Sequence, residues 1–316
     1  MPAAPPLALT TDLATAHGEL ADLRAIMPAG DWVALRTLAD SQPPAARTEL
    51  VWYASSLPGA TVLAQRQVDA DPTDGLAAAL LGSCLIAAAW QVRTSARAQH
   101  VSREQFREFH RVLRGAERML IDAVAYQPAD PALWVCRLIT ARGLQLGQAE
   151  ARRRYDRLAE CDPHHLPGQL TYLQQICPKW GGSFDEMHSF AREAMLAAPD
   201  GAAQGSLVAQ AYVEHLLDLA AKQRDDYRKD PRVRAELGEA AARSVLHPAF
   251  DQQYGWINAV SRFALVFSLL GDHAAAAPHF AAVGNLVSED VWGYFGDPVQ
   301  TFDEFRRKAV AKGGWR

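Results

Sequence analysis

The sequence predicts an all-helical protein made of stacked antiparallel helix pairs, and three observations lead to this fold class. Apolar residues recur at three- and four-residue spacing along most of the 316 residues, which is the period of an amphipathic helix. No stretch of alternating Val, Ile or Thr is bounded by an Asn-Gly or Asp-Gly hairpin turn. Short breaks that carry Pro, Gly or Asp separate the periodic stretches, and such breaks make sequential helices antiparallel neighbours.

The periodic stretches give the expected helices in chain order. In the first half they cover residues 10–27, 31–41, 44–56, 59–70, 74–96, 102–126, 131–145 and 148–161. In the second half they cover residues 165–177, 184–197, 202–223, 231–246, 255–270, 272–284 and 300–312. Residues 102–126 show the pattern well, because Phe109, Leu113 and Leu120 share one face. Ser102 and Gln105 have the spacing of a capping box at the start of this helix.

Composition and charge restrict the class of protein. A net charge of −4 lacks the basic surplus of a nucleic-acid binder, so we expect no nucleic acid partner. Residues 76–90 are the most apolar stretch but are shorter than the ~20 residues of a membrane-spanning helix. We therefore expect a buried core helix and no membrane contact. Residues 1–9 lack the positive start of a signal peptide and predict a short disordered arm.

The four cysteines are scattered through the chain without a CxxC pair. In a chain of this length, that pattern indicates thiols of a reducing compartment rather than a disulfide framework. Cytoplasm is therefore the expected location.

A repeat of about 35 residues runs through part of the chain. Pro128, Pro163 and Pro199 stand 35 and 36 residues apart, close to the ~34-residue period of tetratricopeptide repeats. Residues 258–288 resemble one tetratricopeptide unit at its small, aromatic and turn positions, which are Ala264, Phe267, Gly271, Ala276, Phe280 and Val283. Residues 168–199 resemble a second unit with its turn at Gly182. Residues 131–163 resemble a third, one residue out of register.

The second unit departs from the pattern, because Gln175 occupies the usual small position and Pro178 cuts the first helix short. The segment 178–183 also resembles a turn of an uncharacterised actinobacterial family of helical-repeat proteins. The Ala- and Arg-rich, Lys-poor composition is typical of a GC-rich bacterial genome. These resemblances imply a tetratricopeptide-like α-solenoid and bring no known activity with them.

The expected domain organisation follows from the same patterns. An N-terminal helical region covers residues 10–100, and the repeat region covers residues 101–316. The apolar run ends near residues 97–102, which suggests a boundary there, although a continuous solenoid would give the same sequence pattern.

Stacked helix pairs leave a concave surface that the first helix of each pair lines. The register set by Gly182 and Gly271, together with the two glycines that follow Trp180, predicts a groove lined by Arg137, Gln169, Tyr172, Lys179, Trp180, Asn258, Ser261 and Arg262. This lining is polar and mildly basic, which suits an acidic or extended peptide. It lacks the full Lys, Asn and Arg set of a carboxylate clamp.

Several residue clusters could carry chemistry. Cys161, His164, His165 and Cys177 are of the types that bind zinc. Their spacing is not that of a zinc knuckle, and we expect an inter-helix corner without a metal. Residues 225–230 resemble the aspartate-rich motif of helical terpene synthases, but the basic residues among them predict a charged, solvated segment between helices. The helical histidines His110, His188 and His215 have no evident acidic partner in the sequence. We expect no cofactor.

Three functions remain compatible with the sequence. The leading hypothesis is a non-catalytic protein- or peptide-binding scaffold. The second is an enzyme whose pocket is enclosed by helices, as in an α/α toroid or a helical synthase. The third is a self-associating structural or immunity-type protein that uses residues 76–92 or the C-terminal helix with Phe302 and Phe305. The sequence determines neither the partner nor the oligomeric state.

Overall fold

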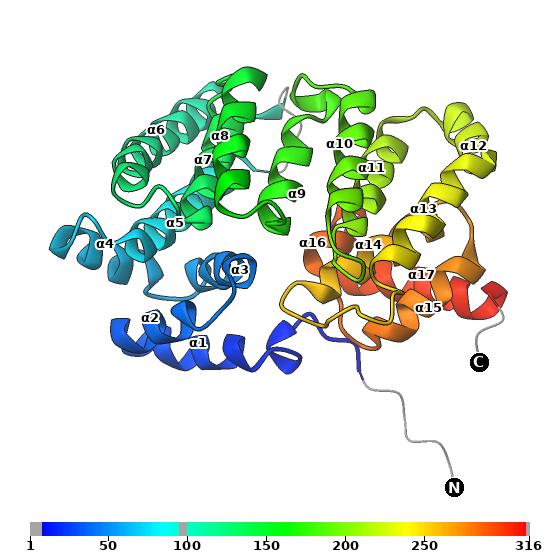
Figure 1. Ribbon diagram of the computed structural model, residues 1–316, viewed down its shortest axis with the longest axis horizontal. Coiled ribbons are helices and arrows are strands. Elements are labelled where there is room, and N and C mark those ends of the chain that lie inside the picture. The colour runs from blue at the N-terminus through cyan, green and yellow to red at the C-terminus, as the bar shows by residue number, and fades with distance from the viewer. Residues whose placement is uncertain (1–7, 95–99, 314–316) are drawn as a thin grey trace, which may run out of the picture. The chain divides into compact units, whose positions relative to one another are not determined.

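The computed structural model describes residues 8–94 and 100–313, and these residues form helices with no β-strand among them. The predicted all-helical class is therefore confirmed (Figure 1). Contacts between helices divide the chain into two compact units. Unit A spans Gly18–Ser183, and unit B combines Phe184–Arg316 with the segment Met1–His17. The arrangement as a tetratricopeptide-like solenoid stays a prediction.

Unit A is a succession of helices that pack around one apolar helix, α5. The elements are α1 (Gly18–Ala29), α2 (Trp32–Asp40), α3 (Pro44–Ser55), α4 (Ala60–Ala70), α5 (Gly75–Arg93), α6 (Arg103–Tyr126), α7 (Pro131–Gly143), α8 (Gln148–Cys161), α9 (Leu166–Gln175) and the 3-10 helix η3 (Pro178–Trp180). Helices α3, α4, α6 and α7 all contact α5. By length and composition α5 could cross a membrane, but 67% of its most apolar window is buried inside the unit, as in a core helix.

Side chains cap several helices of unit A at the residues where the sequence places their starts. Ser102 and Gln105 form the predicted capping box, in which each side chain bonds the other's backbone N–H, at 3.1 and 2.9 Å. Asp31, Asp74 and Asp130 each accept a backbone N–H in the first turn of the following helix. These caps satisfy amides that have no partner within the helix, so they define the helix starts locally.

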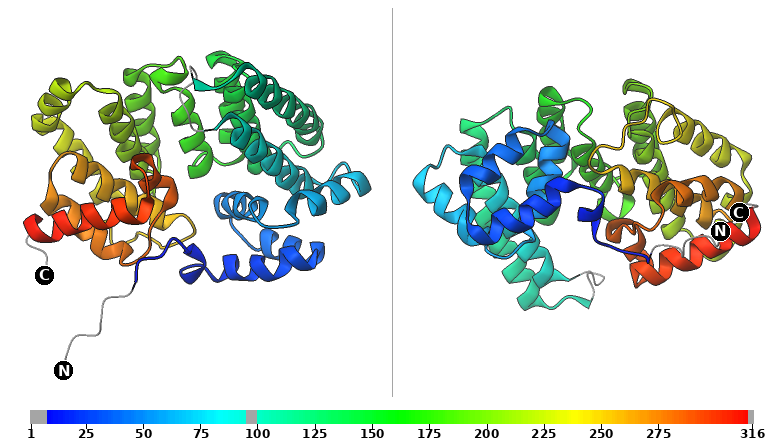
Figure 2. Two further views of the ribbon diagram at one scale, coloured as in Figure 1. Left: turned by 180° about the vertical axis from the view of Figure 1, so that it is seen from behind. Right: turned by 90° about the horizontal axis from the view of Figure 1, so that it is seen from below.

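Unit B contains the elements η1 (Leu13–Thr15), α10 (Phe184–Ala197), α11 (Gly205–Asp218), α12 (Ala221–Lys229), α13 (Pro231–Arg243), α14 (Trp256–Leu269), α15 (His273–Val283), α16 (Glu289–Trp292), η4 (Gly293–Phe295) and α17 (Pro298–Gly313). Helix α17 packs across α15, as Figure 2 shows from behind. An aromatic core joins α15, α16 and α17, in which Phe280, Trp292 and Phe302 are fully buried.

Three expected elements differ from the structure. The helix expected at 10–27 begins only at Gly18, because Thr10 pairs with the backbone of Asn285 and Val287 and η1 follows. The helix expected at 202–223 ends at Asp218, since Leu219 and Ala220 adopt extended backbone angles. A new helix, α12, then starts where Gln223 accepts the N–H of Ala220, at 3.2 Å. The charged segment 225–230 is thus mostly helical, and not the inter-helix linker that we expected.

The chain divides between Ser183 and Phe184 in the structure. Helices α5 and α6, on either side of the boundary expected near residues 97–102, pack against each other within unit A; residues 95–99 of that segment lie outside the described residues. Of the arm expected at residues 1–9, residues 1–7 also lie outside them. The carbonyl of Ala8 accepts a hydrogen bond from the side chain of Asn285, at 3.0 Å.

Candidate functional site

The eight side chains predicted to line a groove are distributed over both units. Unit A holds Arg137, Gln169, Tyr172, Lys179 and Trp180, and unit B holds Asn258, Ser261 and Arg262. Lys179 is exposed, whereas Trp180 and Asn258 are partly exposed. The other five side chains are buried, with at most 9% of each residue accessible. That the eight residues share one groove stays a prediction. The five buried side chains pack inside their own unit.

Trp180 lies in a cluster of rings and guanidinium groups that the helix ends of unit A bring together. We define the Trp–Arg cluster as Trp90, Arg93, Phe109, Arg142 and Trp180. The rings of Trp90 and Trp180 meet edge to face with centroids 6.1 Å apart. The guanidinium carbon of Arg142 lies 5.9 Å from the Trp90 ring and 5.7 Å from the Trp180 ring. Arg93 lies 5.4 Å from the Trp90 ring, so two cations contact two partly exposed tryptophans.

Buried neighbours fix the rings of this cluster. Phe109, only 2% exposed, packs against Trp90 with centroids 5.0 Å apart. Gly143 lets α7 approach α6 at this point, because a Cβ there would lie 2.4 Å from Leu113 and 3.1 Å from Phe109. Gln148, the first residue of α8, donates from its amide to the carbonyl oxygen of Trp180, at 2.9 Å. The aromatic surface is therefore built on helices that are packed together.

The turn after Trp180 depends on two glycines with different roles. Gly181 has a φ of +91°, in the region that favours glycine. Gly182, at the expected turn of the second repeat unit, has no positive φ. It lies so close to the preceding helix end that a Cβ would be 1.9 Å from the carbonyl oxygen of Ile176. Its N–H donates to the carbonyl of Cys177, at 3.2 Å, and closes the turn that carries Trp180.

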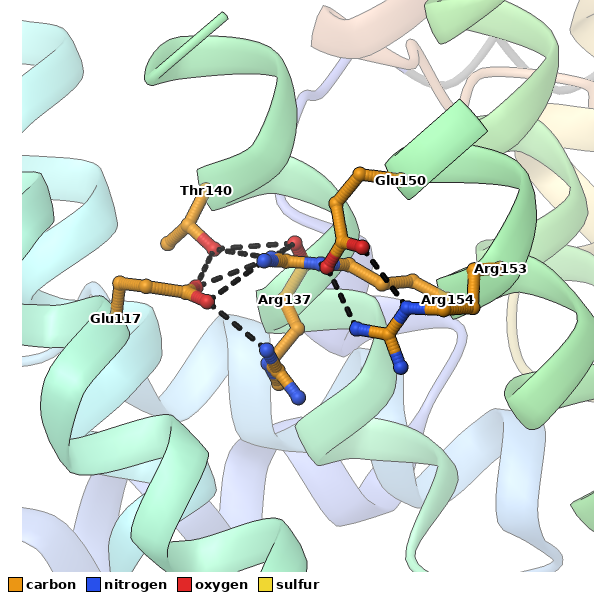
Figure 3. Close-up of polar contacts among 6 residues, drawn as sticks. All are labelled: Glu117, Arg137, Thr140, Glu150, Arg153 and Arg154. Carbon is orange, nitrogen blue, oxygen red and sulfur yellow. Dashed lines mark hydrogen bonds and ion pairs between the residues drawn. The ribbon is translucent and has the colours of Figure 1, made fainter. Parts of the chain in front are cut away.

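Arg137, the predicted groove residue of α7, belongs to a buried ion network that joins α6, α7 and α8. We define the buried ion network as Glu117, Arg137, Thr140, Glu150, Arg153 and Arg154 (Figure 3). Glu117 accepts hydrogen bonds from Arg137 at 3.0 Å, from Thr140 at 2.5 Å and from Arg154 at 2.7 and 3.1 Å. Arg154 is 2% exposed as a residue and also donates to Glu150, at 2.7 Å.

The charged groups of this network stabilise one another. Hydrogen bonds from Arg153 and Arg154 lower the pKa of Glu150 to about 2, against the opposing effect of burial. Burial and the neighbouring Arg154 lower the pKa of Arg137, and Glu117 opposes this shift. Because three helices contribute to one network, its geometry depends on their correct packing.

Unit B holds a second polar cluster, on the facing sides of α11 and α14, which contains the predicted residue Arg262. Arg262 donates from Nε to Gln210, at 3.1 Å. The hydroxyl of Tyr294 donates to the buried carboxylate of Glu214, at 3.1 Å. Burial and the charge of Glu214 raise the pKa of Tyr294, so this phenol stays protonated. These side chains hold η4 against α11.

Two histidines for which the sequence shows no partner lie together in unit B. His188 Nε2 and His215 Nδ1 are 3.0 Å apart, and the hydroxyl of Tyr227 lies 3.0 Å from the same His215 nitrogen. The Phe184 ring stacks on His215 with centroids 3.9 Å apart. Burial lowers the pKa of His188 to about 4 and also lowers that of His215. Both rings are therefore neutral at pH 7, and one of the two facing nitrogens donates to the other.

A further histidine, the buried His279 of α15, should make unit B less stable at acidic pH. It is 1% exposed, neither ring nitrogen has a hydrogen-bond partner in the described part of the chain, and burial lowers its pKa to about 4. Between pH 6.5 and 4 the unfolded chain binds a proton here that the folded chain does not. The neutral His279 therefore contributes its full share to the free energy of unfolding above pH 6.5. That free energy falls by about 3 kcal/mol as the pH is lowered to 4.

Urea unfolding at pH 7 and pH 4 measures this effect when the wild type is compared with His279→Leu. We expect the variant to lose about 3 kcal/mol less than the wild type over this interval. Equal losses in the two proteins would show that His279 does not titrate as its burial requires.

Two residues of the zinc-like cluster, His165 and Cys177, form hydrogen bonds within the protein. The fully buried His165 caps α9, where its Nδ1 accepts the N–H of Gly168 at 3.1 Å. Its Nε2 therefore carries the proton and donates to Thr48, at 3.0 Å. Cys177 is buried and bonds the carbonyl of Leu173, at 3.4 Å. Within residues 8–94 and 100–313, no three Cys, His, Asp or Glu side chains lie together in a way that could hold a metal ion.

Comparisons with protein-family models, with curated proteins and with solved structures found no match to this chain. Its function must therefore be argued from its own residues. Sequence reasoning selected Trp180 but missed Trp90 and Arg142, because nothing in the helical period shows which helix ends meet.

Proposed function

We propose that this chain is a non-catalytic scaffold that binds an acidic peptide segment of a partner protein through the Trp–Arg cluster of unit A. The observation that carries the proposal is the pair of partly exposed tryptophans, Trp90 and Trp180, with Arg142 in contact with both rings. Tryptophan and arginine are enriched among the residues that dominate binding energy in protein interfaces. The packing of Phe109 and the bond from Gln148 reduce the side-chain ordering that binding would cost.

The charge of the cluster favours an acidic partner. Arg93 and Arg142 are partly exposed beside the two rings, and Lys179 is exposed next to Trp180. Three cations around an aromatic surface give a positive potential that attracts carboxylates and repels basic segments. An extended peptide with Asp or Glu residues on either side of an apolar residue would match both features.

A selection experiment tests this function without a known partner. A library of random peptides displayed on phage is panned against the wild-type protein. We expect acidic peptides with one apolar or aromatic residue to be enriched. A selection that recovers no peptide above background, or only basic peptides, would contradict the proposal.

Affinities of one selected peptide, measured by fluorescence anisotropy, then locate the contact. Trp180→Ala is expected to weaken binding by at least about tenfold, since truncating an interface anchor typically costs over 1–2 kcal/mol. Lys179→Ala is expected to weaken binding less and to reduce its salt dependence.

Trp32→Ala is the matched control for Trp180→Ala. Trp32 also lies in unit A, is partly exposed and has an arginine, Arg36, 5.4 Å from its ring. It lies outside the Trp–Arg cluster, so its loss should leave the affinity unchanged. If both tryptophan variants weaken binding equally, the cluster is not the binding surface.

A further inference from the structure

The guanidinium of Arg137 in the buried ion network has one buried donor atom that bonds no described residue. Only 7% of the residue is exposed, and its hydrogen bond to a side chain runs from Nη2 to Glu117, at 3.0 Å. Its Nε is buried and has no hydrogen-bond partner among the residues that the structure describes. In Figure 3 one nitrogen of this group faces Glu117 while another points away from the network. Buried donors without partners are rare in folded proteins and indicate a place for water or an ion.

Arg137 shares its counter-charge with a second buried arginine. The buried ion network contains three arginines and two glutamates, and the side chain of the third arginine, Arg153, is 54% exposed. Glu150 is bonded by both Arg153 and Arg154, and Glu117 is shared among Arg137, Thr140 and Arg154. Among the described residues, Arg137 pairs with Glu117, which it shares with Arg154. An anion beside Arg137 would give this guanidinium a counter-charge of its own in a region of low dielectric constant.

Neighbouring groups hold the guanidinium in one orientation. The Trp134 ring lies against it, with the guanidinium carbon 5.4 Å from the ring centroid. Trp134 is itself fixed, because its indole N–H donates to the carbonyl of Pro128, at 2.8 Å. With Glu117 at one nitrogen and the ring against the guanidinium, Arg137 is preorganised for a small ligand. About 8% of its side chain reaches solvent.

We propose that Arg137, supported by Trp134 and Glu117, forms a subsite for one small oxyanion, a carboxylate or a phosphate. The oxygen atoms of the anion accept hydrogen bonds from the N–H groups of Arg137 that Glu117 does not occupy. Arginine suits this role because its planar donors match the oxygens of either group. The subsite is distinct from the Trp–Arg cluster, and it stands whether or not that cluster binds a peptide.

Nuclear magnetic resonance of the full-length protein, labelled with 15N, tests the subsite. The reporters are the Nε–H signal of Arg137 and the indole N–H signal of Trp134, assigned with Arg137→Lys and Trp134→Phe. Sodium phosphate and sodium acetate are titrated separately, with sodium chloride keeping the ionic strength constant. We expect at least one of the two anions to shift both signals along a saturable curve, and the comparison of the two titrations identifies the preferred oxyanion.

Two variants separate a specific subsite from a general effect of charge. Arg137→Lys keeps the charge but loses the planar donors, and we expect it to weaken the saturable binding, read from the Trp134 signal, by about tenfold or more. Arg153→Lys changes an arginine of the same network whose side chain is 54% exposed. This variant should bind the anion as the wild type does. Wild-type shifts that grow linearly with both anions, without saturation, would overturn the proposal. Equal weakening in the two variants would also overturn it.

Discussion

Glu117→Ala is expected to lower the free energy of unfolding by about 3–5 kcal/mol, because it leaves two buried arginines side by side without their shared counter-charge. In the wild type, Glu117 accepts hydrogen bonds from both Arg137 and Arg154, whose side chains are 8% and 2% exposed. Neither guanidinium can lose its proton at neutral pH. Arg154 keeps its ion pair with Glu150, but Arg137 must stay buried without its partner Glu117 or move to solvent, and either outcome disrupts the packing of α6, α7 and α8.

Urea unfolding followed by circular dichroism measures this loss, and a glutamate on the same helix provides the control. Glu104 pairs with Arg107 at 3.0 Å, but both side chains are about three quarters exposed. Glu104→Ala should change stability by no more than about 0.5 kcal/mol, as is usual for surface ion pairs. If the two variants have the same stability, the network does not hold these helices together.

Gly182→Ala is expected to destabilise unit A by about 3 kcal/mol, at the upper end of the usual cost of overpacking. The added Cβ would lie 1.9 Å from the carbonyl oxygen of Ile176 and 2.4 Å from its carbonyl carbon. Both atoms belong to the backbone, so no side-chain rotation can relieve the contact. The turn that carries Trp180 must open, and the edge-to-face contact with Trp90 should be lost.

Urea unfolding and tryptophan fluorescence together measure this effect. Gly115→Ala in α6 is the matched control, since a Cβ there meets nothing within 4 Å. This control should stabilise the protein by about 0.5–1 kcal/mol, because alanine favours a helix interior over glycine. A Gly182→Ala protein with wild-type stability and an unchanged emission spectrum would show that the turn tolerates a side chain.

Local chemistry explains which parts of the fold the sequence predicts well. The helix that begins after Ser102 was correctly placed, because the Ser102 and Gln105 side chains that start it are three residues apart. The helix break at Leu219 was missed, because neither it nor Ala220 is a residue type that normally ends a helix. In the structure, the break is evident from the extended backbone angles of Leu219 and Ala220 and from the new cap formed by Gln223.

Long-range contacts explain why the candidate site could be predicted only in part. The two glycines that follow Trp180 mark this ring as poorly covered by its neighbours in the chain. Its contacts with Trp90 and Arg142 depend on how α5, α7 and η3 pack, and helical periodicity carries no information about that packing. The same holds for His188 and His215, which lie on different helices and look unpartnered in the sequence.

The most direct test of the proposed function is site-specific photo-cross-linking with an acidic peptide from the selection. A benzophenone amino acid is placed at Lys179, which is exposed beside the Trp–Arg cluster, and in a second protein at Val33, which is 74% exposed on α2. We predict that the peptide cross-links from position 179 and not from position 33, and that Trp180→Ala abolishes the product. Cross-linking from position 33 alone, or equally from both positions, would contradict binding at the Trp–Arg cluster.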